Sequence, residues 1–228
     1  MSTIERSPDR TTSDRPRPRS RLARPGWVIM TLLCVVVCLV VARYLTFDPE
    51  VYFPQQLENY RRVEFALGVH VLCGMLALLI GPLQFVRRLR RRFVRVHRAC
   101  GAVYLASATG LGVSGLILAP TAYTGVGASA AFALLGLATL FTTWTALRMV
   151  LAGRYADHRR WMIRSFSLIM AGVMLRVWMP LYGVAAGLGL VGFSYETAYA
   201  VVAWLCWVPN LLLAIWFTRT SVEPVTAE

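Results

Sequence analysis

The chain has 228 residues, of which 57% are hydrophobic, and its formal net charge is +13. Its mean hydropathy of +0.56 is too high for a soluble domain and is typical of a helical membrane protein. All 24 basic residues are arginines that cluster beside long apolar runs, so the charge does not indicate a nucleic-acid-binding protein.

Six apolar runs are long enough to cross about 30 Å of hydrocarbon as helices. We therefore predict an all-α fold, a polytopic transmembrane helical bundle with about six spans. The runs cover roughly residues 27–45, 65–86, 99–119, 127–147, 162–182 and 195–217. Together they define a membrane domain at 27–217 with a four-helix core at 65–182.

The chain before the first run is rich in Arg, Pro, Ser and Thr. Such a segment cannot bury a core, so we expect residues 1–26 to form a disordered basic tail. A second short tail covers 218–228. The first run with Val40-Val41-Ala42 also resembles a secretory signal peptide and its cleavage site, but its length favours an uncleaved membrane anchor.

Arginine is concentrated in three segments: the N-terminal tail, the turn between the second and third runs, and the turn between the fourth and fifth. The alternating connections are poor in arginine and hold Asp48, Glu50, Glu58 and Glu196. Because cytoplasmic loops carry an excess of basic residues, this pattern predicts cytoplasmic termini. The expected location is the cell membrane, here the bacterial inner membrane, with the lipid bilayer as the main partner.

Three polar residues stand out inside the second and fifth runs. Ionisable groups within a membrane are costly, so they indicate function by default. His70 and Gln84 share one face of the second predicted helix, and Arg176 is expected in the outer part of the fifth. We predict a polar intramembrane cluster of His70, Arg176 and Gln84. As alternatives, His70 bonds a backbone carbonyl between helices, and Arg176 reaches outward to lipid headgroups.

Two His-Arg pairs, His97-Arg98 and His158-Arg159, stand at the start of the third and fifth runs, and Tyr104 shares the face of His97. Two imidazoles at one depth suit an iron ion held from both sides. We predict that His97 and His158 are haem iron ligands, with Arg98, Arg159 and Tyr104 completing the cofactor site. The alternative is that both histidines face lipid phosphates at the membrane interface.

The two His-Arg pairs are 61 residues apart. The same shift brings the apolar run at 65–86 onto the run at about 126–147, and it brings Arg87 onto Arg148. An offset that aligns two apolar runs and their basic ends indicates a duplicated helix pair. Chance recurrence of His-Arg in basic loops is the alternative explanation.

These segments together resemble a bacterial membrane protein family of unknown function, domain of unknown function 2306. The matching motifs are His70-x-x-x-Gly74, Gly81-Pro82-x-Gln84-Phe85, His97-Arg98-x-x-Gly101-x-x-Tyr104, His158-Arg159-x-Trp161-Met162-x-Arg164 and Arg176. The resemblance covers about 65–182 and implies a multi-helix membrane fold without assigning an activity.

The arrangement is more loosely similar to cytochrome b561-type four-helix cores, in which facing histidine pairs hold two haems. That similarity implies an inner haem b on His97 and His158. An outer haem is not implied, because the 61-residue shift brings His70 onto Ala131.

Three functions remain open at this point. The first is a redox module with one inner haem b, in which bis-histidine ligation favours electron transfer over oxygen chemistry. The second is a non-catalytic subunit or assembly factor of a membrane protein complex, with no cofactor. The third is a small carrier or metal-ion site that uses His70, Gln84, Tyr104 and Arg176. The sequence contains none of the nucleotide-binding, zinc-protease or serine-hydrolase motifs of soluble enzymes.

Overall fold

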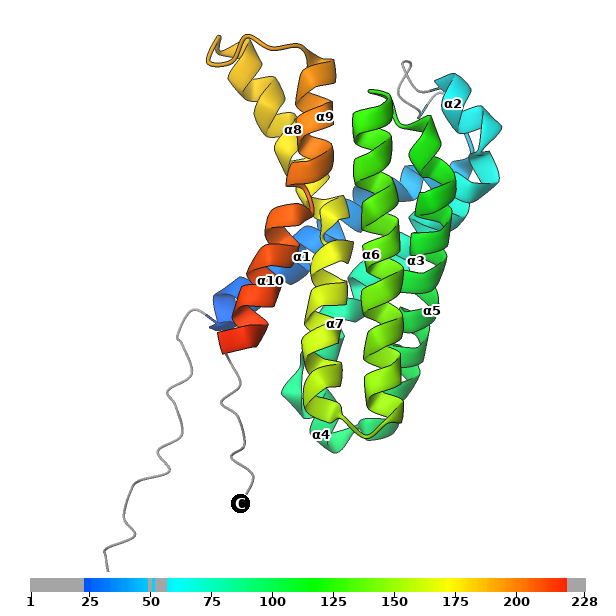
Figure 1. Cartoon of the computed structure of the whole chain (residues 1–228), viewed down its shortest axis with the longest axis vertical. Helices are drawn as coiled ribbons and strands as arrows, with labels where there is room; N and C mark the ends of the chain where they lie inside the picture. Colours follow the sequence, from blue (N-terminus) through cyan, green and yellow to red (C-terminus); the bar gives the residue numbers. More distant parts are fainter. Residues whose placement is uncertain (1–22, 49–50, 52–56, 221–228) are drawn as a thin grey trace, which may run out of the picture.

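The computed structural model describes residues 23–48, 51 and 57–220 (Figure 1). Every regular element within these residues is a helix, and six helical segments are long and apolar enough to cross a membrane. These are Pro25–Thr46, Glu64–Gln84, Val94–Thr121, Val126–Leu151, Tyr155–Gly187 and Tyr195–Arg219. The predicted all-α bundle with six spans is confirmed. Most of the predicted N-terminal tail and of the short C-terminal tail lies outside the described residues.

Four helices form the core of the bundle. They are α3 (Glu64–Gln84), α5 (Val94–Leu118), α6 (Val126–Leu151) and α7 (Tyr155–Ile169). Neighbours in sequence pack as antiparallel pairs, α3 with α5 and α6 with α7, and α5 and α6 join the pairs (Figure 1). Short elements lie at the ends of the bundle: α2 (Leu57–Arg62), α4 (Arg87–Arg92) and η4 (Ala119–Thr121).

The remaining helices flank this core. Helix α1 (Ala23–Val41) continues into η1 (Ala42–Thr46) and packs against α3, contributing Cys34, Val37, Cys38 and Val41 to the buried core. Helices α8 (Ala171–Gly187), α9 (Tyr195–Leu205) and α10 (Val208–Thr220) complete the chain.

The last two predicted spans are each broken into two helices. The break between α7 and α8 falls at Met170, and the break between α9 and α10 falls at Cys206 and Trp207. Pro209 accounts for the second break, because proline lacks the N–H that would bond the carbonyl of Leu205 and its ring crowds that carbonyl. As a result α8 and α9 lean away from the four-helix core toward one end (Figure 1).

Helices α5 and α7 begin several residues before the apolar runs that predicted them, at Val94 and Tyr155. Hydropathy marks only the part of a helix that lies in hydrocarbon, whereas a helix continues through the polar interface. His97 and His158 therefore each occupy the fourth position of a helix, and their backbone N–H groups bond Phe93 and Arg154 respectively.

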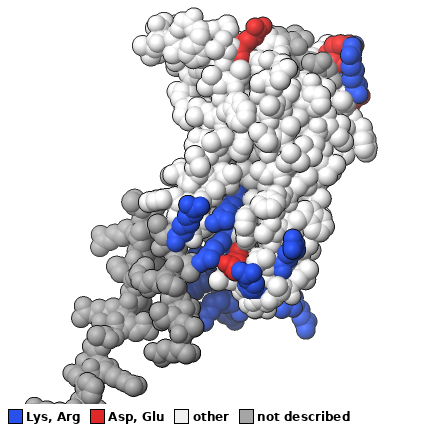
Figure 2. Space-filling model, viewed as in Figure 1, with Lys and Arg blue, Asp and Glu red and all other residues white. Residues whose placement is uncertain are grey.

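The two ends of the molecule differ in chemistry. Figure 2 shows blue arginine side chains gathered at the end that holds α4 and the α6–α7 turn, which we call the arginine end. The described chain also starts and stops at this end (Figure 1). The opposite end, which we call the tyrosine end, carries contacting rings of Tyr123, Tyr195 and Tyr199, whose centroids are 6.0 to 6.5 Å apart.

Two observations agree with the predicted duplication of a helix pair, which stays a prediction. Helices α5 and α7 begin 61 positions apart. Tyr104 of α5 and Ser165 of α7, which are separated by the same 61 positions, are hydrogen-bonded at 3.1 Å. A contact between equivalent positions is expected where two related units meet at a twofold axis.

Helices α5 and α6 approach closely where both carry glycine. A Cβ atom added at Gly112 would lie 2.7 Å from Cγ of Leu140 and 3.3 Å from the carbonyl oxygen of Gly136. Small residues that let two backbones approach are a common means of joining helices in membranes.

We expect Gly112→Ala to lower stability, because the added methyl group would overpack this contact by about 1–3 kcal/mol. Gly183→Ala is the matched control, since Gly183 is also helical and nothing lies within 4 Å of its added Cβ. That control should be neutral or stabilising by up to ~1 kcal/mol. Thermal unfolding in detergent measures both variants, and equal midpoints for the two would contradict the close approach.

Candidate functional site

A cavity of about 740 Å³ lies between the helices in the half of the bundle nearest the tyrosine end. Its wall comes from α1, α3, α5, α6, α8 and α9, with side chains such as Val37, Leu67, Leu135 and Leu175. The wall is mainly apolar, and its principal polar groups are those of Arg43, Tyr60, His70, Arg176, Tyr195 and Tyr199. A concave apolar site with a few convergent polar groups is the usual form of a small-molecule site.

Arg176 brings a positive charge into this wall. Helix α8 carries it, and Nη1 donates a hydrogen bond to the carbonyl oxygen of Gly172, one turn earlier, at 2.9 Å. The hydroxyls of Tyr44, Tyr60 and Tyr199 lie within electrostatic range of the guanidinium. The ion pairs found among the described residues are all elsewhere, so no described carboxylate neutralises Arg176.

His70 of α3 lies in the same wall. Its Nδ1 is 3.3 Å from the hydroxyl oxygen of Ser114 on α5. The Ser114 hydroxyl has one proton, which it directs at the carbonyl oxygen of Gly110 at 2.7 Å. The hydroxyl oxygen therefore accepts from Nδ1–H, which assigns the neutral tautomer whose Nε2 carries a lone pair.

The structure brings together two of the three residues predicted as an intramembrane cluster. His70 and Arg176 line one cavity, but Gln84 does not. Gln84 is buried at the arginine end of α3, where its Oε1 would lie 3.8 Å from a Cβ atom at Gly101. Helical spacing put Gln84 on the face of His70, but fourteen residues separate them by roughly 21 Å along the axis.

The predicted inner residues lie at the arginine end. His97 is within electrostatic range of His158, Arg90 and Arg98. Nδ1 of His158 is 2.8 Å from the carbonyl oxygen of Ala146, to which it donates. Nδ1 of His97 is buried without a hydrogen-bond partner.

Arginines surround this histidine pair. Arg98 and Arg159 are both exposed beside it, as expected of groups that reach toward an anion. Burial, followed by the neighbouring charges of Arg159 and Arg87, lowers the pKa of Arg90 below its usual range. The arginine end is therefore a region of concentrated positive charge around the two imidazoles.

Tyr104 does not stand beside His97, although both belong to α5 and to the predicted inner site. It is fully buried, and its hydroxyl is 3.1 Å from Oγ of Ser165, which in turn is 2.8 Å from Oγ1 of Thr143. This chain of three hydroxyls joins α5, α7 and α6. Tyr104 therefore serves the packing of the core, seven residues or roughly 10 Å along the helix from His97.

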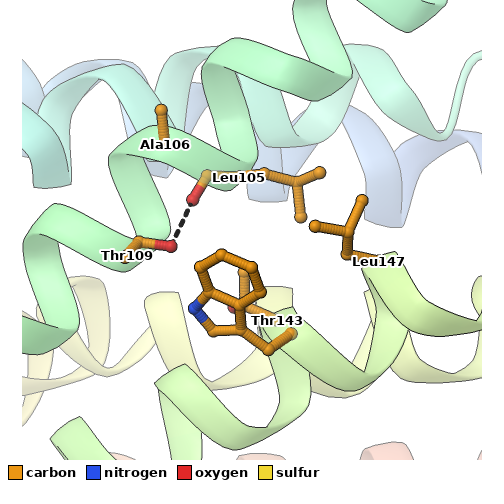
Figure 3. Close-up of a pocket in the computed structure, with 6 residues that line it drawn as sticks. Leu105, Ala106, Thr109, Thr143 and Leu147 are labelled. Carbon is orange, nitrogen blue, oxygen red and sulfur yellow. Dashed lines mark hydrogen bonds between the residues drawn. The ribbon is translucent and has the colours of Figure 1, made fainter.

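A second, smaller hollow of about 230 Å³ lies between α5 and α6 (Figure 3). It is lined by Leu105, Ala106, Thr109, Thr143, Trp144 and Leu147. The Thr109 hydroxyl donates to the carbonyl of Leu105 at 2.8 Å, and the Thr143 hydroxyl bonds Ser165. Because both threonine hydroxyls are satisfied, this hollow is best explained as part of the apolar surface of the bundle.

The sequence analysis missed the tyrosines of the large cavity. Tyr60 comes from α2, and Tyr195 and Tyr199 come from α9, two segments that the hydropathy pattern placed beside or at the ends of spans. The spacing of Tyr195 and Tyr199 by one helical turn was the one available signal that they share a face. Nothing in the sequence placed that face opposite α3 and α8.

Comparison with known proteins gives one match. The model of a family described as "Predicted membrane protein (DUF2306)" matches residues 67–218. No curated protein and no solved structure matches the chain. The match covers every helix from α3 to α10 and hence most of the cavity wall.

Proposed function

The chain belongs to the DUF2306 family of predicted membrane proteins, and we propose that it binds an amphipathic anion in the large cavity. In this proposal Arg176 holds the anionic head group, and the apolar wall holds the remainder of the ligand. Among the three functions that the sequence left open, anion binding in this cavity is most similar to the third, a small carrier that uses His70 and Arg176. The observation that carries it is a guanidinium in an apolar cavity without a described carboxylate partner.

The charge of Arg176 supports an anionic ligand. A cation within the hydrocarbon region costs several kcal/mol unless an opposite charge or good hydrogen bonds compensate it. One of its N–H groups is used by Gly172, and tyrosine hydroxyls provide partial charges nearby. A carboxylate or phosphate oxygen from a ligand would supply the missing charge and accept two parallel hydrogen bonds from the planar guanidinium.

His70 supports a second polar contact. Its neutral imidazole lies in the same cavity wall as Arg176, so both residues belong to the polar part of the site. The cavity volume of about 740 Å³ falls within the ~300–1,000 Å³ typical of small-molecule sites.

We expect Arg176→Gln to weaken binding of a fluorescent polyene carboxylate, cis-parinaric acid, by about 10- to 100-fold. The loss corresponds to one charged hydrogen-bonded contact. Fluorescence titration of the purified protein measures it, with the methyl ester of the probe as the uncharged ligand. The ester should bind the wild type and the variant equally.

Arg62→Gln is the matched control, because Arg62 is an exposed arginine at the same end that pairs with Glu58 at 3.2 Å. It should bind the acid as the wild type does. Arg176→Gln should also keep the unfolding temperature of the ligand-free protein, since it removes an uncompensated charge. Unchanged affinity of Arg176→Gln for the acid would rule the proposal out, as would a large loss of stability without the ligand.

We also infer that the arginine end faces the cytoplasm of a bacterial inner membrane. Two arginine-rich segments, α4 and the α6–α7 turn, lie at this end, in agreement with the preference of basic loops for the cytoplasmic side. Both termini would then be cytoplasmic.

A membrane-impermeant maleimide tests this orientation in spheroplasts. Glu58→Cys at the tyrosine end should react in intact spheroplasts, and Arg91→Cys in α4 should react only after lysis. The wild type controls for the five native cysteines. The reverse pattern of labelling would show that the tyrosine end, and not the arginine end, faces the cytoplasm.

A second candidate function, electron transfer through haem b at the arginine end, is favoured by the state of the two histidines. The bond from Nδ1 of His158 to Ala146 leaves Nε2 as the ligating nitrogen, an arrangement common in metal-binding histidines. Arg98 and Arg159 would pair with the propionates. A haem bound there would supply one-electron transfer. Neither of the two cavities described above is lined by His97 or His158, so the geometry favours the anion site.

Haem at this position predicts a Soret absorption band in protein expressed with ample haem. The band should be lost in His97→Ala and in His158→Ala and retained in His70→Ala, which is the histidine control. Absence of the band in the wild type would remove this candidate.

The role as a non-catalytic subunit of a membrane complex stays a prediction, and no contact within a single chain bears on it.

A further inference from the structure

The wall of the large cavity is exposed on one side only. Five of its lining residues are exposed: Val36 and Val40 on α1, Arg43 in η1, Pro180 on α8, and Tyr195 at the start of α9. Val36 is 54% exposed and Val40 is 47% exposed. The lining residues on α3, α5 and α6 are buried or half-buried. The cavity therefore reaches the surface chiefly between α1 and α8.

Helices α1 and α8 meet at one point and then diverge. At the meeting point Sγ of Cys34 on α1 lies 3.6 Å from Sδ of Met170, the residue that precedes α8. Beyond it α1 runs behind the four-helix core, whereas α8 leans away from the core toward the tyrosine end (Figure 1). Val40 is roughly 9 Å past the crossing along α1, and Pro180 is roughly 15 Å past it along α8.

The edges of this opening are apolar. On α1 they are Val36 and Val40, and on α8 they are Met179 and Pro180. Both helices belong to segments that are long and apolar enough to span a membrane, so these edges face lipid. Arg176 precedes Pro180 by one helical turn, and its guanidinium reaches back along α8 to the carbonyl oxygen of Gly172, which also lines the cavity.

We propose that the ligand is a single-chain membrane amphiphile that passes sideways from the bilayer into the cavity between α1 and α8. This inference rests on the proposed function. The head group moves inward to Arg176, and the chain lies along the apolar edges formed by Val36, Val40 and Met179. A lipid-facing opening with a cation directly behind its rim selects a long-chain anion over a water-soluble one.

Two sources supply this chemistry, a free fatty acid and an anionic phospholipid. They share an anionic head and a long hydrocarbon chain but differ in the number of chains. The single opening between two helices fits one chain, so the proposal commits to the fatty-acid type. The phospholipid is an outcome that the experiment distinguishes.

The test measures how fast cis-parinaric acid, dissolved in the lipid of a nanodisc, reaches the protein. Val40→Phe adds bulk to the rim of the opening, and we expect it to slow both association and dissociation of the probe by about threefold or more. Leu39→Phe is the matched control, because Leu39 is the next residue on α1, is 72% exposed and does not line the cavity. It should behave as the wild type.

Val40→Ala widens the rim and should accelerate both rates, which excludes misfolding as the cause of the effect. Equal rates in Val40→Phe and Leu39→Phe would overturn the lateral opening while leaving the anion site intact. Failure of the wild type to bind the probe would instead overturn the proposed function.

Displacement of the probe by oleate, but not by dioleoyl phosphatidic acid at the same mole fraction, supports the single-chain class. Equal displacement by both lipids would contradict it.

Discussion

The account depends on one charge in an apolar environment, the guanidinium of Arg176 on α8. Hydrocarbon does not solvate a cation, and a single carbonyl oxygen from Gly172 uses only one of its five N–H donors. The described residues supply tyrosine hydroxyls around the group but no carboxylate in an ion pair with it. An arrangement of this kind in a membrane protein indicates a ligand that brings its own negative charge.

The breaks in the last two spans create the room for that ligand. Four regular helices, α3, α5, α6 and α7, pack closely enough for Gly112 of α5 to meet Gly136 of α6. Helices α8 and α9 do not lie in line with α7 and α10; they lean outward, and a cavity lies between them and α1 and α3 (Figure 1). The same divergence opens the wall to lipid. The close packing of the core therefore comes from α3, α5, α6 and α7, whereas access of a ligand to the cavity depends on α8 and α9.

The sequence predicted the six spans, their order and the concentration of arginine at one end, because hydrophobic length and charge are local properties. It grouped His70 with Arg176 from their expected depth, and both residues line the large cavity. Gln84 was grouped with them on a shared helix face, which ignored the distance along the axis, and Tyr104 was given to the inner site although it bonds Ser165 in the core. The lean of α8 and the convergence of Tyr60 and Tyr199 on one cavity depend on tertiary packing, and no local pattern carries that information.

An experimentally determined structure of the protein in a lipid nanodisc tests the central claim most directly. The account predicts elongated density in the cavity, with its head within about 3 Å of the guanidinium of Arg176 and its chain directed between α1 and α8. A structure in which Arg176 pairs with a carboxylate of the chain itself, or extends to the outer surface with the cavity closed behind it, would contradict the account.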